Sequence, residues 1–430
     1  MIRHDRTNRI VLVATILGAA GAAFADLAPG RLGLLAAGAL VCLVAFVFWP
    51  WAVLPVGLVG ATAIIPALGD GHVTFIVEVH AGVLATGAVA LVTRRMLSLP
   101  GDEPVRTIVD LPMLVLAGIV LVAAGYGLTL GNARHDIFIA AYELAVAPAY
   151  FFLATHTLTS EYRLRAAGIL YVVLAGGLAV SQFTQPGRHG GLLSVLVLPS
   201  LLVTASRLRG VRRAGIVLLI AGFAADITLA AYRAMWLATG LALLVLFVRA
   251  KGPIRRAVSV AALTGVLLTA NAVLLSAGAH ARAVLVGQEL HQSAGYRASE
   301  AAVGLNVFDH RPLLGGGLGQ SVPDIYLPDF AVTNVGPTYH VFYVMILANM
   351  GLMGLVAMLW PLLRALRAGL AHADGHSLAF ACLTCGFLAS AAFAGPTDGH
   401  WELGLLPALT LLTARLENKA PSSYALEGAR

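Results

Sequence analysis

The sequence predicts an all-α membrane protein, a polytopic bundle of about 12 to 14 transmembrane helices with one large outer loop. Composition is the first reason: the 430 residues are 59% hydrophobic and only 11% charged, a balance that soluble globular domains do not show. Patterning is the second, because the apolar runs continue over roughly twenty residues, enough to cross a bilayer as a helix. The strands of a membrane β-barrel would instead alternate apolar and polar residues.

About fourteen apolar runs qualify as spans by their hydropathy. They lie near residues 10–27, 31–49, 51–68, 73–93, 108–130, 136–158, 165–183, 190–206, 213–230, 233–249, 256–276, 340–362, 377–395 and 400–416. The first run is expected to be a retained signal-anchor, because it lacks a clean cleavage site and further spans follow it. If the pair joined by the aromatic turn at 48–51, or the last pair, forms one re-entrant unit, the count falls to about twelve.

The connections between the predicted spans are short, except for the one that precedes the run at 340–362. We expect this loop to lie outside the membrane and to contain helices near 280–292 and 296–308, the second of which ends before Pro312 and a run of glycines. The predicted organisation is therefore transmembrane helices over 1–276, the outer loop over 277–339, C-terminal transmembrane helices over 340–416 and a cytoplasmic tail over 417–430.

The distribution of basic residues gives the orientation and the first indication of a site. With a cytoplasmic N-terminus, 21 of the 28 Lys and Arg residues fall on the inner side. The other seven are all arginines on the outer side: Arg31, Arg134, Arg188, Arg233, Arg282, Arg297 and Arg311. Because the planar guanidinium suits phosphate, they predict an outward-facing site for an anionic lipid phosphate. Snorkelling to lipid headgroups accounts equally well for Arg31, Arg134 and Arg282.

Charge and cysteine usage exclude several other classes of function. The net charge of +7 comes from the inner loops, so it indicates contact with anionic membrane lipids and not with nucleic acid. Cys42, Cys382 and Cys385 all lie in apolar runs, and the Cys-x-x-Cys pair lacks a second pair of ligands, so these residues are expected to pack in the core. No cluster of carboxylates suggests a metal, and we expect neither a metal nor a cofactor.

The strongest site candidates stand at the predicted outer ends of spans or in the long loop. Arg233 follows Tyr232 where a span begins, and His340 lies where the loop re-enters the membrane, so both share the depth of a lipid headgroup. Arg297, next to Tyr296, could fold down from the loop. An interfacial histidine without a function is the alternative for His340.

Four further residues are possible supporting members of this site: Asp226, Tyr296, Gly315 and Gly317. Asp226 lies seven residues before Arg233, on the same helical face, and is placed to orient that arginine. Gly315 and Gly317 could expose backbone N–H groups to an anion, although glycines beside a proline more often form a turn. Arg311, one of the seven outer arginines, directly precedes that proline, Pro312.

The order of these motifs resembles the O-antigen ligase and polymerase superfamily over about residues 185–360. Its members often have Ser-Arg-Gly where this chain has Tyr232 and Arg233, and Pro-Leu-Leu-Gly-x-Gly where it has residues 312–317. They also have His-Asn followed by Gly-Leu-x-Gly, where this chain has His340 and residues 351–354. Val341 stands where the family has the asparagine, so a neighbour that would orient the histidine is missing.

The resemblance implies a GT-C-type glycosyltransferase of the bacterial inner membrane, with both termini cytoplasmic and the active site on the outer face. It would transfer a glycan from undecaprenyl pyrophosphate to a hydroxyl of an acceptor glycan or of lipid A-core, without a metal. The resemblance implies that Arg233 and Arg297 bind the pyrophosphate and that His340 positions or deprotonates the acceptor hydroxyl. Arg188 and Arg311 are secondary candidates for the pyrophosphate.

Several alternatives stay open at the level of sequence. The motifs do not separate a ligase from a polymerase, and a protein O-oligosaccharyltransferase also fits. A transporter or flippase would instead use ionisable residues within the spans, such as Glu78, Glu143 and Asp226. In a non-catalytic membrane scaffold, the outer arginines would have no function.

Overall fold

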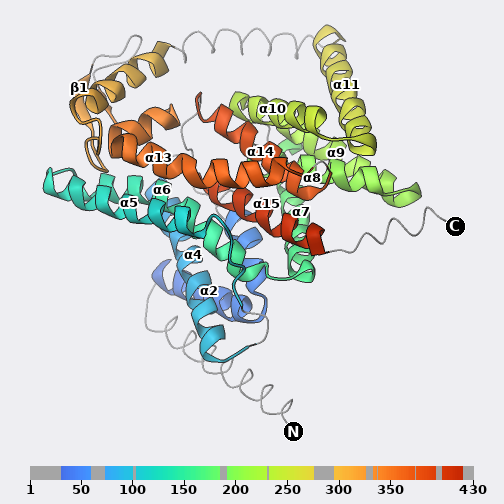
Figure 1. Cartoon of the computed structure of the whole chain (residues 1–430), viewed down its shortest axis with the longest axis horizontal. Coiled ribbons are helices and arrows are strands. Elements are labelled where there is room, and N and C mark those ends of the chain that lie inside the picture. Colours follow the sequence, from blue (N-terminus) through green and yellow to red (C-terminus); the bar gives the residue numbers. More distant parts are fainter. Residues whose placement is uncertain are drawn as a thin grey trace. The chain divides into compact units, whose positions relative to one another are not determined.

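The computed structural model has the predicted all-α architecture (Figure 1). The structure describes residues 31–59, 73–99, 103–184, 191–229, 232–275, 295–325, 333–336, 338–372, 374–393 and 400–419. Its helices are α2 (Arg31–Phe48), η1 (Pro50–Ala52), α4 (Val73–Met96), α5 (Asp110–Thr129), α6 (Arg134–Thr157), α7 (Glu161–Thr184), α8 (Leu192–Arg207), α9 (Gly210–Leu229), α10 (Arg233–Arg249), α11 (Gly252–Leu275), α13 (Phe342–Leu370), α14 (His376–Ser390) and α15 (Glu402–Lys419). Two further helical segments cover residues 53–59, directly after η1, and residues 295–310, in the long loop between α11 and α13.

The predicted spans that fall on described residues coincide with helices, often to within a few residues, as for α10 at 233–249. Within the part of the chain that the structure describes, four helical segments are long and apolar enough to cross a membrane: Asp110–Thr129, Arg134–Thr157, Glu161–Val180 and Phe342–Leu370. The run predicted at 10–27, the loop helix predicted at 280–292 and the last eleven residues of the tail lie outside the described residues. The chain is thus a multi-pass membrane protein, and its total span count stays a prediction.

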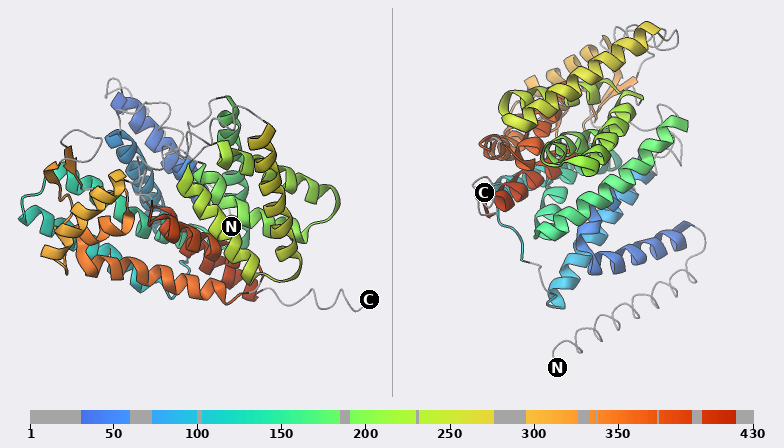
Figure 2. Two further views of the ribbon diagram at one scale, coloured as in Figure 1. Left: turned by 90° about the horizontal axis from the view of Figure 1, so that it is seen from above. Right: turned by 90° about the vertical axis from the view of Figure 1, so that its right-hand side faces the viewer.

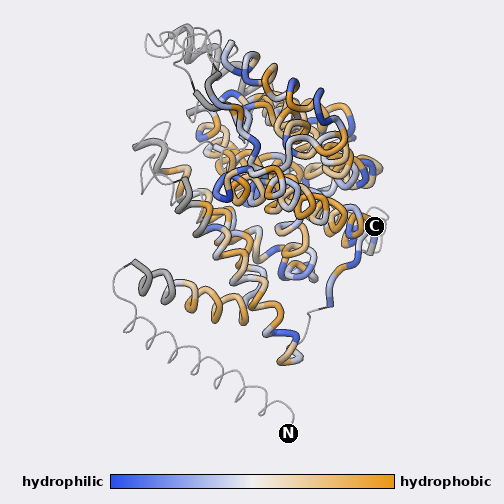
Figure 3. The backbone as a smooth tube through the Cα atoms, turned by 90° about the vertical axis from the view of Figure 1, so that its left-hand side faces the viewer, coloured by the Kyte–Doolittle hydropathy of each residue, from blue (hydrophilic) through white to orange (hydrophobic). Residues whose placement is uncertain are grey.

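Large apolar side chains on the surface of α5 support burial in lipid. Leu111, Leu114, Leu121 and Val122 are each more than half exposed in the isolated chain. A soluble protein rarely exposes so continuous an apolar face, because each such side chain costs free energy in water. In Figure 3, hydrophobic residues run along the length of most helices, as lipid contact requires.

The chain forms two compact units. The first comprises Met1–Val105 with Leu153–Leu174, and the second comprises Arg106–Phe152 with Ala175–Arg430. In the first unit the buried guanidinium of Arg94, in α4, donates a hydrogen bond to the backbone carbonyl of Val47, in α2. The second unit contains the long loop and the main site candidates of the sequence, Arg233, Arg297 and His340.

The second unit is organised around α10, α13, α14 and α15, and α14 and α15 pack side by side (Figures 1 and 2). Gly386 of α14 brings that helix against the backbone of α10, since a Cβ there would lie 2.2 Å from the carbonyl oxygen of Ala238. Farther along α10, Leu246 belongs to the same buried cluster as Leu378 of α14. From the first contact to the second, the residue number rises along α10, from 238 to 246, and falls along α14, from 386 to 378. These two helices therefore run antiparallel.

Helix α13 changes direction at Gly351, where the long loop docks on it. Gly351 has φ +62° and ψ −160°, a non-helical conformation inside the helix. The loop supplies a hydrogen-bond acceptor to the backbone after this kink, because the N–H of Leu352 donates to the carbonyl of Pro312 at 2.8 Å. In return, the N–H of Gly316 donates to the carbonyl of Ala348 at 2.7 Å. The two glycine-containing motifs therefore lie against each other.

The glycine run also inserts between α5 and α6. The side-chain amide of Asn132 donates to the carbonyl oxygens of Gly316 and Leu318 at 3.1 and 2.9 Å. Gly317 has φ +75°, and a Cβ on it would lie 2.7 Å from the backbone of Gly127 in α5. Only glycine permits this backbone-to-backbone contact, so the run acts as a packing element that anchors the loop.

A short β-hairpin-like pair of strands, which the sequence did not indicate, extends the long loop. Strands β1 (Val322–Ile325) and β2 (Thr333–Val335) are antiparallel, with Val322 opposite Val335 and Ile325 opposite Thr333. This pair leads the chain back to the start of α13.

Candidate active site

One face of the helix at 295–310 carries the central residues of the site. Tyr296, Glu300 and Gly304 are spaced four residues apart and therefore lie on the same side of the helix. Gly304 allows close approach to the start of α13, since a Cβ there would lie 2.5 Å from Val344 and 2.8 Å from the ring of Tyr339. One turn earlier on this face, Glu300 consequently meets the residue next to Tyr339, which is His340.

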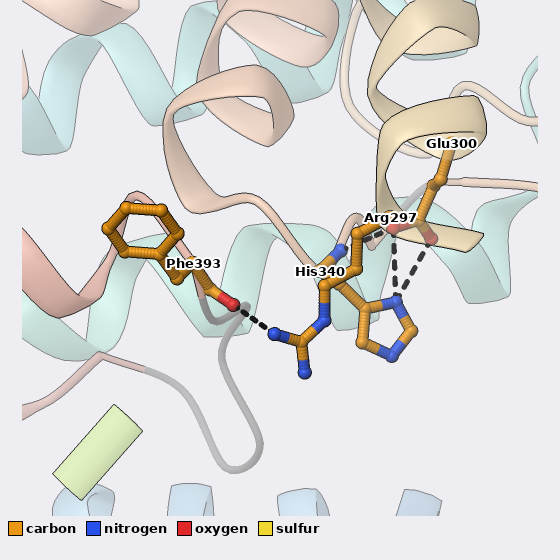
Figure 4. Close-up of polar contacts among 4 residues, drawn as sticks. All are labelled: Arg297, Glu300, His340 and Phe393. Carbon is orange, nitrogen blue, oxygen red and sulfur yellow. Dashed lines mark hydrogen bonds and ion pairs between the residues drawn. The ribbon is translucent and has the colours of Figure 1, made fainter. Parts of the chain in front are cut away.

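Glu300 binds both the backbone and the ring of His340 (Figure 4). The backbone N–H of His340 donates to Oε2 of Glu300 at 2.8 Å, and ring atom Nδ1 lies 3.0 and 3.2 Å from Oε2 and Oε1. Glu300 is 3% exposed, whereas the side chain of His340 is 53% exposed. A buried carboxylate thus holds an imidazole whose other edge is open.

Two tyrosines enclose this pair. The ring of Tyr296 meets the ring of His340 edge-on, with centroids 5.4 Å apart and planes at 86°. Burial, and to a lesser extent the negative charge of Glu300, raises the pKa of Tyr339 to about 12. The same two causes raise the pKa of Tyr296. Both phenols therefore stay protonated and uncharged near neutral pH, leaving Glu300 as the acidic group beside His340.

Arg297, next to Tyr296, reaches the end of α14. Its Nη1 donates to the carbonyl oxygen of Phe393 at 2.5 Å (Figure 4). The carbonyls beyond a helix C-terminus carry partial negative charge, which suits a guanidinium. The start of α13 is tied to the same end, because the N–H of Phe342 donates to the carbonyl of Ala391 at 3.1 Å. Arg297 and His340 are therefore brought together at the end of α14.

Arg233 opens α10 at this same end of the unit. Ala238 of α10 contacts Gly386 of α14, and the helices are antiparallel. Arg233 and Ala391 each lie about five residues, or roughly 7 Å of helix rise, beyond that contact in the same direction. The half-buried Arg233 thus stands level with the end of α14 at which Arg297 and His340 meet.

The other sequence candidates are placed differently. Arg188 lies outside the described residues. Arg311 is exposed at the far end of the helix that carries Arg297, about 20 Å away by helix rise, so the structure does not bring it to the cluster. Buried Asp226 accepts a hydrogen bond from the hydroxyl of Ser194 at 2.5 Å, and its orientation of Arg233 stays a prediction.

The described contacts of the glycine run are packing contacts, and its binding of an anion stays a prediction. The N–H of Gly315 donates to the carbonyl of Arg311 at 2.8 Å, and that of Leu318 donates to the carbonyl of Ala123 at 3.1 Å. Together with the amide of Gly316, these donors are occupied by backbone carbonyls. The positive φ of Gly315 and Gly317 serves the turn that seats the loop on α5 and α13.

Sequence reasoning missed two histidine–carboxylate pairs at this end of the unit. Glu300 is the first, and its only signal was a spacing of three residues from Arg297. The second pair is buried, with Nδ1 of His400 lying 2.5 Å from Oε1 of Glu402. The His400 ring packs on Phe342, at 4.0 Å between centroids, two residues after His340.

Among the residues that the structure describes, no group of three or more His, Cys, Asp or Glu side chains gathers as metal ligands would. The cations at the candidate site are arginines, which can bind an anion directly through their N–H groups.

Comparison with known proteins relates one segment of the chain to a family. Residues 214–359 match the family model described as O-antigen ligase, whereas no curated protein matches the chain. The matched segment contains Arg233, Arg297, Glu300, His340 and the kink at Gly351, and it indicates an O-antigen ligase-like, glycosyltransferase-type activity acting on lipid-linked glycan and an acceptor. The predicted resemblance to the O-antigen ligase and polymerase superfamily is therefore confirmed, and residues 214–359 carry it.

Proposed function

We propose that this protein transfers a glycan from undecaprenyl pyrophosphate to a sugar hydroxyl at the outer face of the bacterial inner membrane. The observation that carries the proposal is that Arg297 and His340 lie at the end of α14, level by helix rise with Arg233 at the start of α10, within the O-antigen ligase segment. The acceptor would be either a growing glycan or lipid A-core. The N- and C-termini would be cytoplasmic, as the positive-inside bias predicts.

In the proposed reaction, the acceptor hydroxyl oxygen forms a bond with the anomeric carbon of the donor. The bond from that carbon to the pyrophosphate oxygen breaks, and its electron pair leaves with undecaprenyl pyrophosphate. His340 takes the hydroxyl proton, a role that a neutral imidazole performs well near pH 7. That proton later passes from the imidazolium to water.

The two arginines would stabilise the charge that develops on the leaving pyrophosphate. The guanidinium of Arg297 has five N–H donors, of which one serves Phe393. Donors that are fixed before reaction stabilise a developing anion by up to a few kcal/mol each, because they need no reorganisation. Arg233 opens an α-helix, whose N-terminal end also favours a negative charge. The proposal needs no further cation.

The glycan profile of a host that lacks the protein tests this function and separates its two forms. Single repeat units with the ladder of longer glycans lost would identify a polymerase. Full-length polymer retained on undecaprenyl pyrophosphate would identify a ligase. Complementation with the wild-type protein restores the normal profile in either case. A profile that is unchanged by the deletion would contradict the proposal and favour a transporter or a scaffold.

Substituting Arg233 or Arg297 by lysine tests the phosphate contact. Lysine keeps the positive charge but loses the planar fork that binds two phosphate oxygens at once, so we expect transfer to fall by about tenfold or more. The rate is measured with purified protein and membranes of the deletion host. Arg134→Lys, at an exposed arginine that opens α6, is the matched control and is expected to retain the full rate. Full activity of both site variants would exclude bidentate phosphate binding.

A further inference from the structure

The contacts between Glu300 and His340 determine which ring nitrogen is available for reaction. A carboxylate only accepts hydrogen bonds, and Nδ1 of His340 lies within hydrogen-bond distance of both Glu300 oxygens. The hydrogen of the neutral ring therefore resides on Nδ1, and Nε2 keeps its lone pair. None of the described residues hydrogen-bonds to Nε2, and the side chain is about half exposed, so that atom is open to a substrate.

The hold on His340 is rigid as well as directional. One carboxylate binds the backbone amide and the ring of the same residue, which fixes the side-chain rotation of the histidine relative to its own main chain. Tyr296 limits the ring from the side, and Gly304 keeps the supporting helix close to Tyr339. Glu300 thus orients His340, whose neighbour Val341 has no polar side-chain group that could do so.

We propose that Glu300 is a positioning residue that holds the proton on Nδ1 of His340 and makes Nε2 the atom that receives the acceptor proton. This inference rests on the proposed function. When the hydroxyl attacks the anomeric carbon, its proton moves to Nε2, and the imidazolium that results is stabilised by the adjacent carboxylate. The carboxylate itself stays unprotonated throughout, as in other carboxylate–imidazole pairs.

Glu300→Gln tests this assignment, because glutamine keeps the size but offers one acceptor oxygen to two donors. We expect the transfer rate to fall by about 10²-fold, since the ring loses either its tautomer or its anchor. The imidazolium also loses its anionic neighbour, so more acid is needed to protonate Nε2, and the acidic limb of the pH–rate profile moves to lower pH. The assay uses purified protein added to membranes of the deletion host, which supply donor and acceptor.

Two further variants keep the test decisive. Glu300→Asp retains the charge, so it should keep the wild-type acidic limb and recover part of the rate. Asp309→Asn removes an exposed carboxylate from the same helix and should leave both the rate and the limb unchanged. Elution and apparent Tm in detergent report whether each variant folds.

Each outcome has a distinct meaning. A Glu300→Gln protein with the wild-type rate overturns the inference, and so does one that is slow but keeps the wild-type acidic limb, because that result describes a purely structural residue. The proposed function fails separately, when the wild-type protein itself restores no transfer to membranes of the deletion host. A variant that does not fold is replaced by Glu300→Asp, for which a shifted acidic limb would overturn the inference.

Discussion

His340→Ala is expected to reduce glycan transfer by about 10³-fold or more, while the protein remains folded. The loss follows from the removal of the proposed base, because a hydroxyl that keeps its proton is a poor nucleophile. The stability of the protein should change little, since the His340 side chain is about half exposed and its described hydrogen bonds go to a single carboxylate. The complemented deletion host should show the same glycan profile as the deletion itself.

His310→Ala is the matched control for this experiment. His310 is an exposed histidine at the end of the same loop helix, and its Nδ1 lies 2.8 Å from the carbonyl of Asn306. It has no described contact with Glu300 or Arg297, so its substitution should leave transfer at the wild-type level. Wild-type transfer by His340→Ala would exclude a catalytic role for His340, whatever the result for His310.

Hydropathy alone placed most of the helices. The helices α5, α10 and α13 were predictable because a membrane-spanning helix must be long and continuously apolar. Such a run consists of consecutive residues, so it can be read directly from the sequence. The order of motifs in the sequence selected Arg233 and His340 as site candidates. What the sequence could not show was which of these residues meet, since that depends on the packing of helices that are far apart in the chain.

Glu300 illustrates the limit most clearly. It lies forty residues from His340, and apart from its spacing of three residues from Arg297 nothing local distinguishes it from any other glutamate in an amphipathic helix. Its role emerges only when Gly304 lets that helix approach the start of α13. The glycine run is a second example. Its composition predicted a turn or an anion-binding loop, but could not show that the close approach permitted by glycine brings the run against Gly127 and the kink of α13.

Gly351→Ala is expected to destabilise the second unit by roughly 2–5 kcal/mol. Its backbone angles lie in a region that essentially only glycine occupies, so a side chain there is strained in any surroundings. The surroundings add a clash, because a Cβ would lie 2.4 Å from the backbone carbon and oxygen of Leu313. Relief of either cost would require the loop to leave α13, with loss of the hydrogen bond between Leu352 and Pro312.

The measurement is the apparent Tm in detergent, compared with two control variants that separate the causes. Gly210 has φ +59°, close to that of Gly351, but nothing lies within 4 Å of its Cβ position, so Gly210→Ala has only the backbone strain. Gly118, in α5, has neither strain nor neighbours, so Gly118→Ala should be neutral or slightly stabilising. An apparent Tm for Gly351→Ala equal to that of Gly210→Ala would contradict the docking of the loop. If docking is confirmed, the loss of transfer in Gly351→Ala is accompanied by loss of folded protein, whereas in His340→Ala it is not. That difference separates the residue that shapes the loop from the residue that acts within it.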